Sequence, residues 1–120
     1  MHRFDGRRIL VVEDEVIIGM MATDMLEDMG ATVLGPALTV AQGMRMAGSE
    51  QADAALVDVN LNGTRSDAVI EALARRQIPI VVTTGYGRAA ENGGGHPVLE
   101  KPYTAEALAR ALAAVLDAQP

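Results

Sequence analysis

Short, apolar, β-branched runs alternate with segments of helical periodicity along most of this 120-residue chain. Residues 9–12 and 80–82 are apolar without interruption, which is typical of strands buried on both faces of a sheet. Strands that alternate with helices form right-handed crossovers around a parallel sheet. The sequence therefore predicts an α/β fold, a doubly wound, five-stranded parallel sheet. We expect one domain over residues 1–120, with no output domain.

Turn residues and helix caps set the bounds of these elements. The predicted strands are 9–12, 32–34, 54–57, 80–82 and 98–99, and Gly35-Pro36 closes the second of them. The predicted helices are 18–29, which Gly30 ends, 40–48, 67–76 and 105–116, with N-caps at Thr39, Ser66 and Thr104. Five of the eleven residues 85–95 are glycine, which predicts a short or irregular fourth helix.

Composition excludes several classes of function. Sixteen acidic and ten basic residues give a formal net charge of -6, which argues against nucleic acid as a partner. The absence of cysteine excludes disulfides, thiolate metal sites and cysteine nucleophiles. No apolar stretch approaches the ~18 residues that span a membrane, and the N-terminus does not read as a signal peptide, so we expect a cytoplasmic protein. Most of the methionines recur at helical spacing, among them Met20, Met21, Met25 and Met29. This spacing predicts that they fill the hydrophobic core.

Polar residues follow the predicted strands at the edge where parallel sheets bind ligands. In chain order they are Glu13, Asp14, Glu15, Asp58, Asn60, Thr84 and Lys101. Each one alone has a structural explanation, for example as a helix cap or a surface charge. Together, however, the carboxylates would repel one another without a cation, and oxygen ligands suit Mg²⁺ or Mn²⁺. A lysine and a hydroxyl beside that cation would suit a phosphoryl group, with a carboxylate as nucleophile.

Four motifs occur in order at these strand ends. They are residues 11–15 (Val-Val-Glu-Asp-Glu), residues 56–60 (Leu-Val-Asp-Val-Asn), Thr84-Gly85 and Lys101-Pro102-Tyr103. Together they resemble the receiver domain of two-component response regulators, and the resemblance covers nearly the whole chain. It implies the flavodoxin-like receiver fold and a signalling protein rather than an enzyme.

The resemblance also implies roles for individual residues. Asp58 would attack the phosphorus of a phosphohistidine on a histidine kinase or a phosphotransfer protein. Asp14 and Asp58 would ligate Mg²⁺ or Mn²⁺, Glu13 would hold the ion through water, and Asn60 would offer its backbone carbonyl. The Thr84 hydroxyl and the Lys101 ammonium would bind phosphoryl oxygens, and the Lys101-Pro102 bond is often cis in this family. The acyl phosphate would hydrolyse slowly, so the domain would also be an autophosphatase.

A narrower resemblance concerns residues 79–86. Pro79, Thr84, Gly85 and Tyr86 match the Pro-Phe-x-Phe-Ala-Thr-Gly-Tyr signature of the FAT GUY subclass of receivers, whereas residues 80, 82 and 83 depart from it. Val98 stands where most receivers carry an aromatic switch residue, and the subclass tends to lack that aromatic. This resemblance implies a role in alphaproteobacterial stress signalling with a kinase of the HWE or HisKA2 type.

Two departures from the family pattern affect the switch. The loop 60–63 lacks the usual proline and is shorter, and Val98 removes the usual threonine–aromatic coupling. We hypothesise that Thr84 still moves toward the phosphoryl group and that Tyr86 or the glycine-rich segment responds. We expect a monomer that signals through contacts with a downstream protein.

Other functions fit the residues less well. A haloacid-dehalogenase-type enzyme needs a second acid where Asn60 stands, and a dinucleotide-binding module needs a Gly-x-Gly-x-x-Gly after the first strand. A pseudo-receiver would have lost residues that are intact here. Within the receiver function, a phosphate sink or shuttle for a kinase is the alternative to a regulator that activates a partner.

Overall fold

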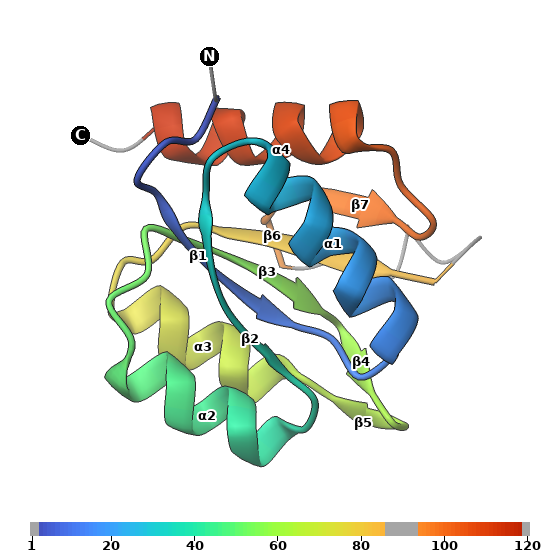
Figure 1. Cartoon of the computed structure of the whole chain (residues 1–120). Coiled ribbons are helices and arrows are strands. Elements are labelled where there is room, and N and C mark those ends of the chain that lie inside the picture. Colours follow the sequence, from blue (N-terminus) through green and yellow to red (C-terminus); the bar gives the residue numbers. More distant parts are fainter. Residues whose placement is uncertain (1–2, 86–93, 119–120) are drawn as a thin grey trace.

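The computed structural model describes residues 3–85 and 94–118. In this part of the chain, five parallel strands form one sheet in the order β2-β1-β3-β6-β7 (Figure 1). The strands are β1 (Arg8–Val12), β2 (Thr32–Ala37), β3 (Ala54–Asp58), β6 (Ile80–Thr84) and β7 (Val98–Glu100). The helices of the described residues are α1 (Val16–Asp28), α2 (Val40–Ser49), α3 (Asp67–Arg75) and α4 (Ala105–Asp117). The predicted doubly wound parallel sheet is confirmed. Tyr86 and most of the segment 85–95, where a fourth helix was predicted, fall on residues 86–93, outside the described residues.

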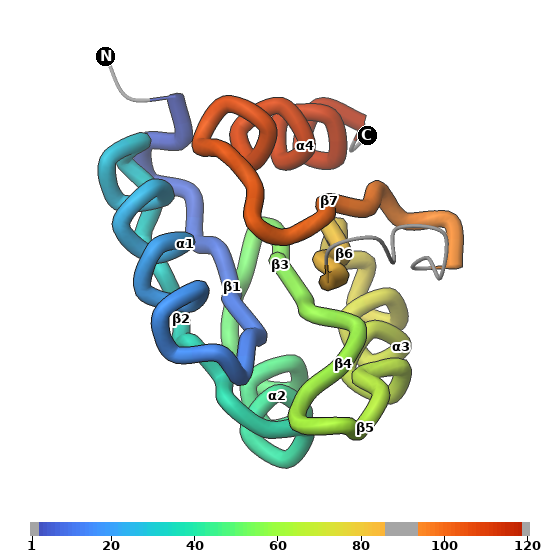
Figure 2. Tube along the Cα trace, turned by 90° about the vertical axis from the view of Figure 1, so that its right-hand side faces the viewer, coloured from blue at the N-terminus to red at the C-terminus, as the bar shows by residue number. Residues whose placement is uncertain are grey.

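The helices cover the two faces of the sheet in pairs. Helices α1 and α4 lie on one face, and α2 and α3 lie on the other (Figures 1 and 2). Because successive side chains of a strand point to opposite faces, Ile9 and Val11 pack toward the first pair, and Leu10 and Val12 toward the second. The chain therefore has two aliphatic cores that hold the sheet between them.

Each strand of the sheet extends beyond the apolar run that predicted it. Strand β2 continues through Gly35 and Pro36 to Ala37, and strands β3 and β6 include Asp58 and Thr84 as their last residues. The reason is that ladder pairing does not require an apolar side chain: Asp58 is still in register with Thr83. As a result, both polar side chains are fixed by the sheet and buried, with only 3% and 2% of their surface exposed.

The three predicted N-cap positions are confirmed, but only the two threonines make a side-chain capping bond. The hydroxyl oxygens of Thr39 and Thr104 accept hydrogen bonds from the backbone N–H groups of Gln42 and Ala107. Ser66 precedes α3, but its side chain makes no capping bond. Its hydroxyl instead donates to the backbone carbonyl of Asp58, a tertiary partner that local sequence does not indicate.

The prediction that the methionines fill the core is wrong for part of α1. Met20 and Met21 are 59% and 42% exposed, whereas Met25 and Met29 pack partly buried against the core. Helix α1 approaches β2 through a small residue, since a Cβ at Gly19 would lie 3.3 Å from the side chain of Pro36. The buried face of α1 consists of Gly19, Ala22 and Leu26, and Met20 and Met21 lie outside it.

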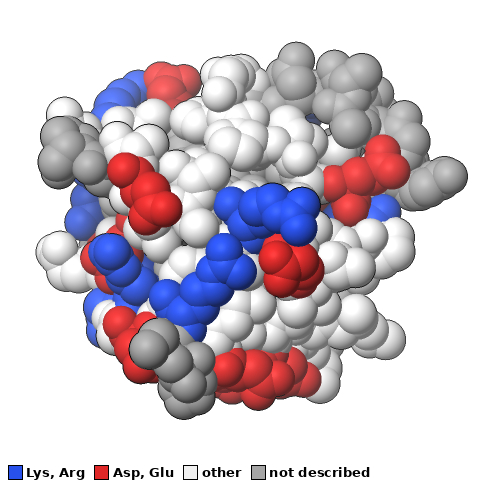
Figure 3. All heavy atoms as spheres, turned by 90° about the horizontal axis from the view of Figure 1, so that it is seen from above, with Lys and Arg blue, Asp and Glu red and all other residues white. Residues whose placement is uncertain are grey.

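The surface over α4 carries charges of both signs. Glu106 pairs with Arg110 at 3.5 Å and with Arg3 at 3.9 Å, and Figure 3 shows acidic and basic side chains interleaved on this side of the molecule. Among the described residues, no helix is both long and apolar enough to cross a membrane.

Candidate functional site

A cleft of about 690 Å³ opens at the carboxyl ends of β1, β3, β6 and β7. Such an edge is where doubly wound sheets bind their ligands. The residues that line the cleft are Asp14, Glu15, Asp58, Val59, Asn60, Asn62, Gly63, Arg65, Thr84, Gly85 and Lys101.

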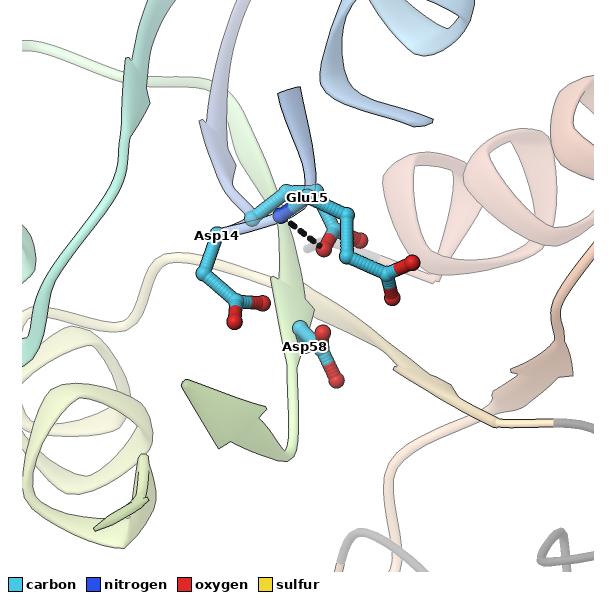
Figure 4. Close-up of side chains that lie close together, drawn as sticks. Asp14, Glu15 and Asp58 are labelled. Atoms are coloured by element: carbon cyan, nitrogen blue, oxygen red, sulfur yellow. Dashed lines mark hydrogen bonds between the residues drawn. The ribbon is translucent and has the colours of Figure 1, made fainter. Parts of the chain in front are cut away.

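Four carboxyl groups meet at this cleft. Glu13, Asp14, Glu15 and Asp58 each place one oxygen within 4.8 Å of the others. Glu13 and Asp58 are buried, Asp14 is half-buried and Glu15 is exposed. Figure 4 shows the side chains of Asp14 and Glu15 projecting from the end of β1 on the side where Asp58 lies. The cluster predicted from the sequence is therefore assembled, and its all-oxygen donor set is the kind that a hard divalent cation prefers.

The single lysine of the chain lies among these acids. The Nζ atom of Lys101 donates to Glu15 Oε1 at 2.7 Å and to Asp58 Oδ2 at 2.9 Å. The two Glu13 oxygens are 3.3 and 3.4 Å away. The peptide bond between Lys101 and Pro102 is cis, in agreement with the receiver resemblance.

Backbone and side-chain hydrogen bonds fix the orientation of Asp58. Its Oδ1 accepts from the backbone N–H of Asn60 at 3.1 Å, while Oδ2 accepts from Lys101. Its main-chain carbonyl accepts from Ser66, which is fully buried. Asp58 is thus a buried acid of the cleft whose two carboxylate oxygens accept from the Lys101 ammonium and from a backbone N–H.

The short loop after β3 forms a hairpin that the sequence analysis missed. Strands β4 (Asn60–Leu61) and β5 (Thr64–Arg65) pair antiparallel around Asn62 and Gly63, whose φ angles are 54° and 84°. Two consecutive positive φ angles define a turn that the dipeptide Asn-Gly favours. This dipeptide is the sequence feature from which the hairpin could have been predicted. The backbone N–H of Asn62 donates to Asp14 Oδ2 at 2.9 Å, so the turn fixes a second acid of the cluster.

Thr84 lies at the end of β6, beside the lysine. Its backbone carbonyl accepts from the N–H of Lys101 at 2.7 Å, which joins the ends of β6 and β7 at the cleft. Val98, which stands where most receivers carry an aromatic, is a partly buried residue of β7. The structure thus brings together all six predicted site residues, while Tyr86 lies outside the described residues.

Burial and charge shift the pKa values at the site in opposite ways. Burial raises the pKa of Glu13 to about 8, and the nearby Asp58 carboxylate adds to this shift. Burial by itself would lower the pKa of Lys101, but its hydrogen bonds to Glu15 and Asp58 outweigh that effect and raise the pKa above its usual value. The neighbouring acids therefore favour the charged form of Lys101, whereas burial favours the neutral form of Glu13.

A match to a known protein family identifies the class of this domain. Residues 9–113 match the family model described as the response regulator receiver domain. The chain belongs to the response-regulator receiver family. The transcriptional regulatory protein PdtaR of Mycobacterium tuberculosis is 30% identical over 104 residues, which cover 82% of this chain. The chain spans about half the length of the curated relatives it matches, 51% in this case.

Solved structures of receivers have the same fold. SdrG from Sphingomonas melonis Fr1 is 43% identical, with a TM-score of 0.83 over 92% of this chain and 96% of that one. The receiver domain of the sensor histidine kinase PA1611 from Pseudomonas aeruginosa is 25% identical, with a TM-score of 0.82 over 94% and 99% of the two chains. That structure contains a magnesium ion in the active-site cleft. PhyR from Brucella abortus is 25% identical, with a TM-score of 0.84 over 96% of this chain and 49% of that one.

Proposed function

We propose that this receiver domain accepts a phosphoryl group on Asp58 from a phosphohistidine of a kinase or phosphotransfer protein and signals through protein–protein contacts. The observation that carries the proposal is the position of Asp58, which is buried among acids with Lys101 Nζ 2.9 Å from one carboxylate oxygen. A carboxylate oxygen forms the new bond to phosphorus while the bond from phosphorus to the histidine nitrogen breaks. The electron pair of the broken bond stays on the histidine nitrogen, and a proton from solvent makes the leaving imidazole neutral.

The cleft supports this transfer mainly through position and charge. Phosphoryl transfer needs in-line placement and neutralisation of charge rather than covalent chemistry from other side chains. The hydrogen bond from the Asn60 N–H orients Asp58, and Lys101 supplies a positive charge on the same carboxylate. The buried Thr84 lies at the end of the neighbouring strand, where its hydroxyl would contact a phosphoryl oxygen.

The acidic cluster fits a divalent cation. We propose that Mg²⁺, or Mn²⁺, is held by Asp14 and Asp58, by the backbone carbonyl of Asn60, and through water by Glu13. When bound, the ion would reduce the repulsion between the anionic phosphoryl group and the carboxylates. The oxygen-only donor set and the magnesium ion in the PA1611 receiver support this assignment.

The face of α1 next to the cleft is suited to a protein partner. This face carries four apolar side chains that are exposed to solvent. They are Val16 (59% exposed), Ile17 (72%), Met20 (59%) and Met21 (42%). Helix α1 starts directly after Glu15, which lines the cleft, so its exposed first turns begin beside the cleft. We propose that the histidine-bearing protein docks here, and that the chain acts either as a regulator of a downstream protein or as a phosphate shuttle.

A role in stress signalling of the FAT GUY type extends this proposal. The support is the partial match of residues 79–86 to that signature and the 43% identity to SdrG. The absence of an aromatic at Val98 also fits the subclass. A kinase of the HWE or HisKA2 type would then be the phosphoryl donor.

Intact mass after incubation with acetyl phosphate and Mg²⁺ tests the central proposal. We expect the wild-type protein to gain one phosphoryl group and to gain none when Mg²⁺ is chelated. Asp58→Asn should gain none, while Asp24→Asn, which changes an exposed acid of α1, should behave like wild type. Phosphorylation of Asp58→Asn would overturn the assignment, as would a wild-type protein that accepts nothing from acetyl phosphate or from a phosphorylated kinase.

The raised pKa of Glu13 predicts a pH-dependent stability. Between its unfolded pKa of 4.5 and its folded pKa of about 8, the folded state holds a proton that the unfolded state has released. The metal-free protein should therefore lose stability as pH rises from about 5 to about 9. Mg²⁺ favours ionised carboxylates, so its binding should release protons near pH 7 and flatten this dependence. Urea denaturation at several pH values, with and without Mg²⁺, checks both effects, and a metal-free protein of constant stability would contradict the prediction.

A further inference from the structure

Glu15 has a side-chain contact that its position in the chain does not explain. It is the N-cap residue of α1, yet its side chain makes no capping hydrogen bond. A carboxylate at this position ordinarily accepts from N–H groups of the first turn. The side chain of Glu15 instead projects from the end of β1 on the side where Asp58 lies (Figure 4). There Oε1 accepts from Lys101 Nζ at 2.7 Å, the shortest contact of that ammonium.

The ammonium group of Lys101 has no spare hydrogen-bonding capacity. It offers three N–H donors, and it has three carboxylate partners within 3.4 Å, namely Glu13, Glu15 and Asp58. Lys101 can therefore contact an incoming phosphoryl oxygen only if one of these partners is displaced.

Of the three partners of Lys101, Glu15 can be displaced from the ammonium at the lowest free-energy cost. Asp58 is the acceptor itself, and Glu13 is buried and also accepts from the backbone N–H of Glu15 at 3.0 Å. The side chain of Glu15 is 59% exposed, so water can solvate its charge once it is released. Among the described residues, its only side-chain hydrogen bond is the one to Lys101.

We infer that Glu15 is a positioning residue, an exchangeable counter-ion that holds Lys101 over Asp58 at rest and is displaced by a phosphoryl oxygen. The inference rests on the proposed function. While bound, Glu15 competes with an anionic donor for Lys101 and adds negative charge at the mouth of the cleft. Removing its charge should therefore accelerate phosphorylation by a small anionic donor.

The first test compares rates of phosphorylation by acetyl phosphate in the presence of Mg²⁺. In this reaction Asp58 forms a bond to phosphorus and acetate leaves. We expect Glu15→Gln to react about twofold to fivefold faster than wild type, the range that corresponds to an exposed ion pair. Asp24→Asn removes one exposed charge from the same helix without contacting Lys101, and it should react at the wild-type rate. Equal acceleration in both variants, or none in Glu15→Gln, would overturn the inference.

The second test observes the exchange itself. Because Lys101 is the only lysine, lysine labelled with ¹⁵N at Nζ gives a single side-chain NMR signal. At one fixed pH with Mg²⁺ present, we expect this signal to differ between wild type and Glu15→Gln, and to coincide once beryllium trifluoride occupies Asp58. A difference that persists with beryllium trifluoride would mean that Glu15 is not displaced. If wild type is not phosphorylated at all, the proposed function fails and the inference falls with it. If wild type is phosphorylated but the lysine signal is identical in both proteins at rest, only the inference fails.

Discussion

Replacement of Lys101 by methionine is expected to lower the free energy of unfolding of the metal-free protein by about 3–5 kcal/mol near pH 9. The side chains of Lys101, Glu13 and Asp58 are 8%, 4% and 4% exposed, so the variant leaves two carboxylates buried without their cation. The loss should be smaller near pH 6, because Glu13 can then take up a proton. Mg²⁺ should recover much of the stability, since it supplies the missing positive charge.

Urea denaturation with and without Mg²⁺ measures this effect. Arg110→Met is the matched control, because Arg110 pairs with Glu106 at a site where the side chains are 75% and 67% exposed. We expect that variant to change stability by less than about 0.5 kcal/mol. A Lys101→Met protein as stable as wild type at both pH values would show that the buried acids do not depend on the ammonium.

Gly35→Ala is expected to destabilise the protein by about 3 kcal/mol or more. The φ angle of Gly35 is +97°, and an added Cβ would lie 2.7 Å from the Ala37 nitrogen and 2.8 Å from the Val11 oxygen. Both atoms belong to the backbone of paired strands, so no side-chain rotation can relieve the contact. The position lies where the register of β1 and β2 shifts, between Leu10 and Val12.

Gly48→Ala tests whether this loss is specific to the site. Gly48 lies in α2, and nothing lies within 4 Å of the position that its Cβ would occupy. Alanine there should stabilise the helix by about 0.5–1 kcal/mol. The two variants should therefore shift the thermal midpoint in opposite directions, and a Gly35→Ala protein with a wild-type midpoint would contradict the backbone argument.

The sheet and most of the site were predictable because their signals are local. Apolar runs predict strands, and polar residues at the ends of parallel strands converge at one edge, which brought Asp14, Asp58 and Lys101 together. The true ends of β3 and β6 were not predictable in this way, because pairing continues past the last apolar residue to Asp58 and Thr84.

Contacts between segments that are distant in the chain account for the remaining differences between the predicted and the observed structure. Ser66 precedes a helix and so suggested a cap, but a carbonyl eight residues earlier in the chain is its partner. The helical spacing of the methionines could not show that α1 packs through Gly19, Ala22 and Leu26, which leaves Met20 exposed. Glu15 was recognised as one of several acids, and only the fold shows that it shares the ammonium of Lys101.

The hairpin after β3 has a consequence for transferring this site to another receiver. Pairing of β1 with β3 brings the ends of these two strands together. One N–H of the hairpin then orients Asp58, and another, two residues later, orients Asp14, so both carboxylates depend on the backbone of a single tight turn. A graft that keeps the sheet but lengthens this turn by even one residue should therefore lose the bond to Asp14, whatever side chains it carries.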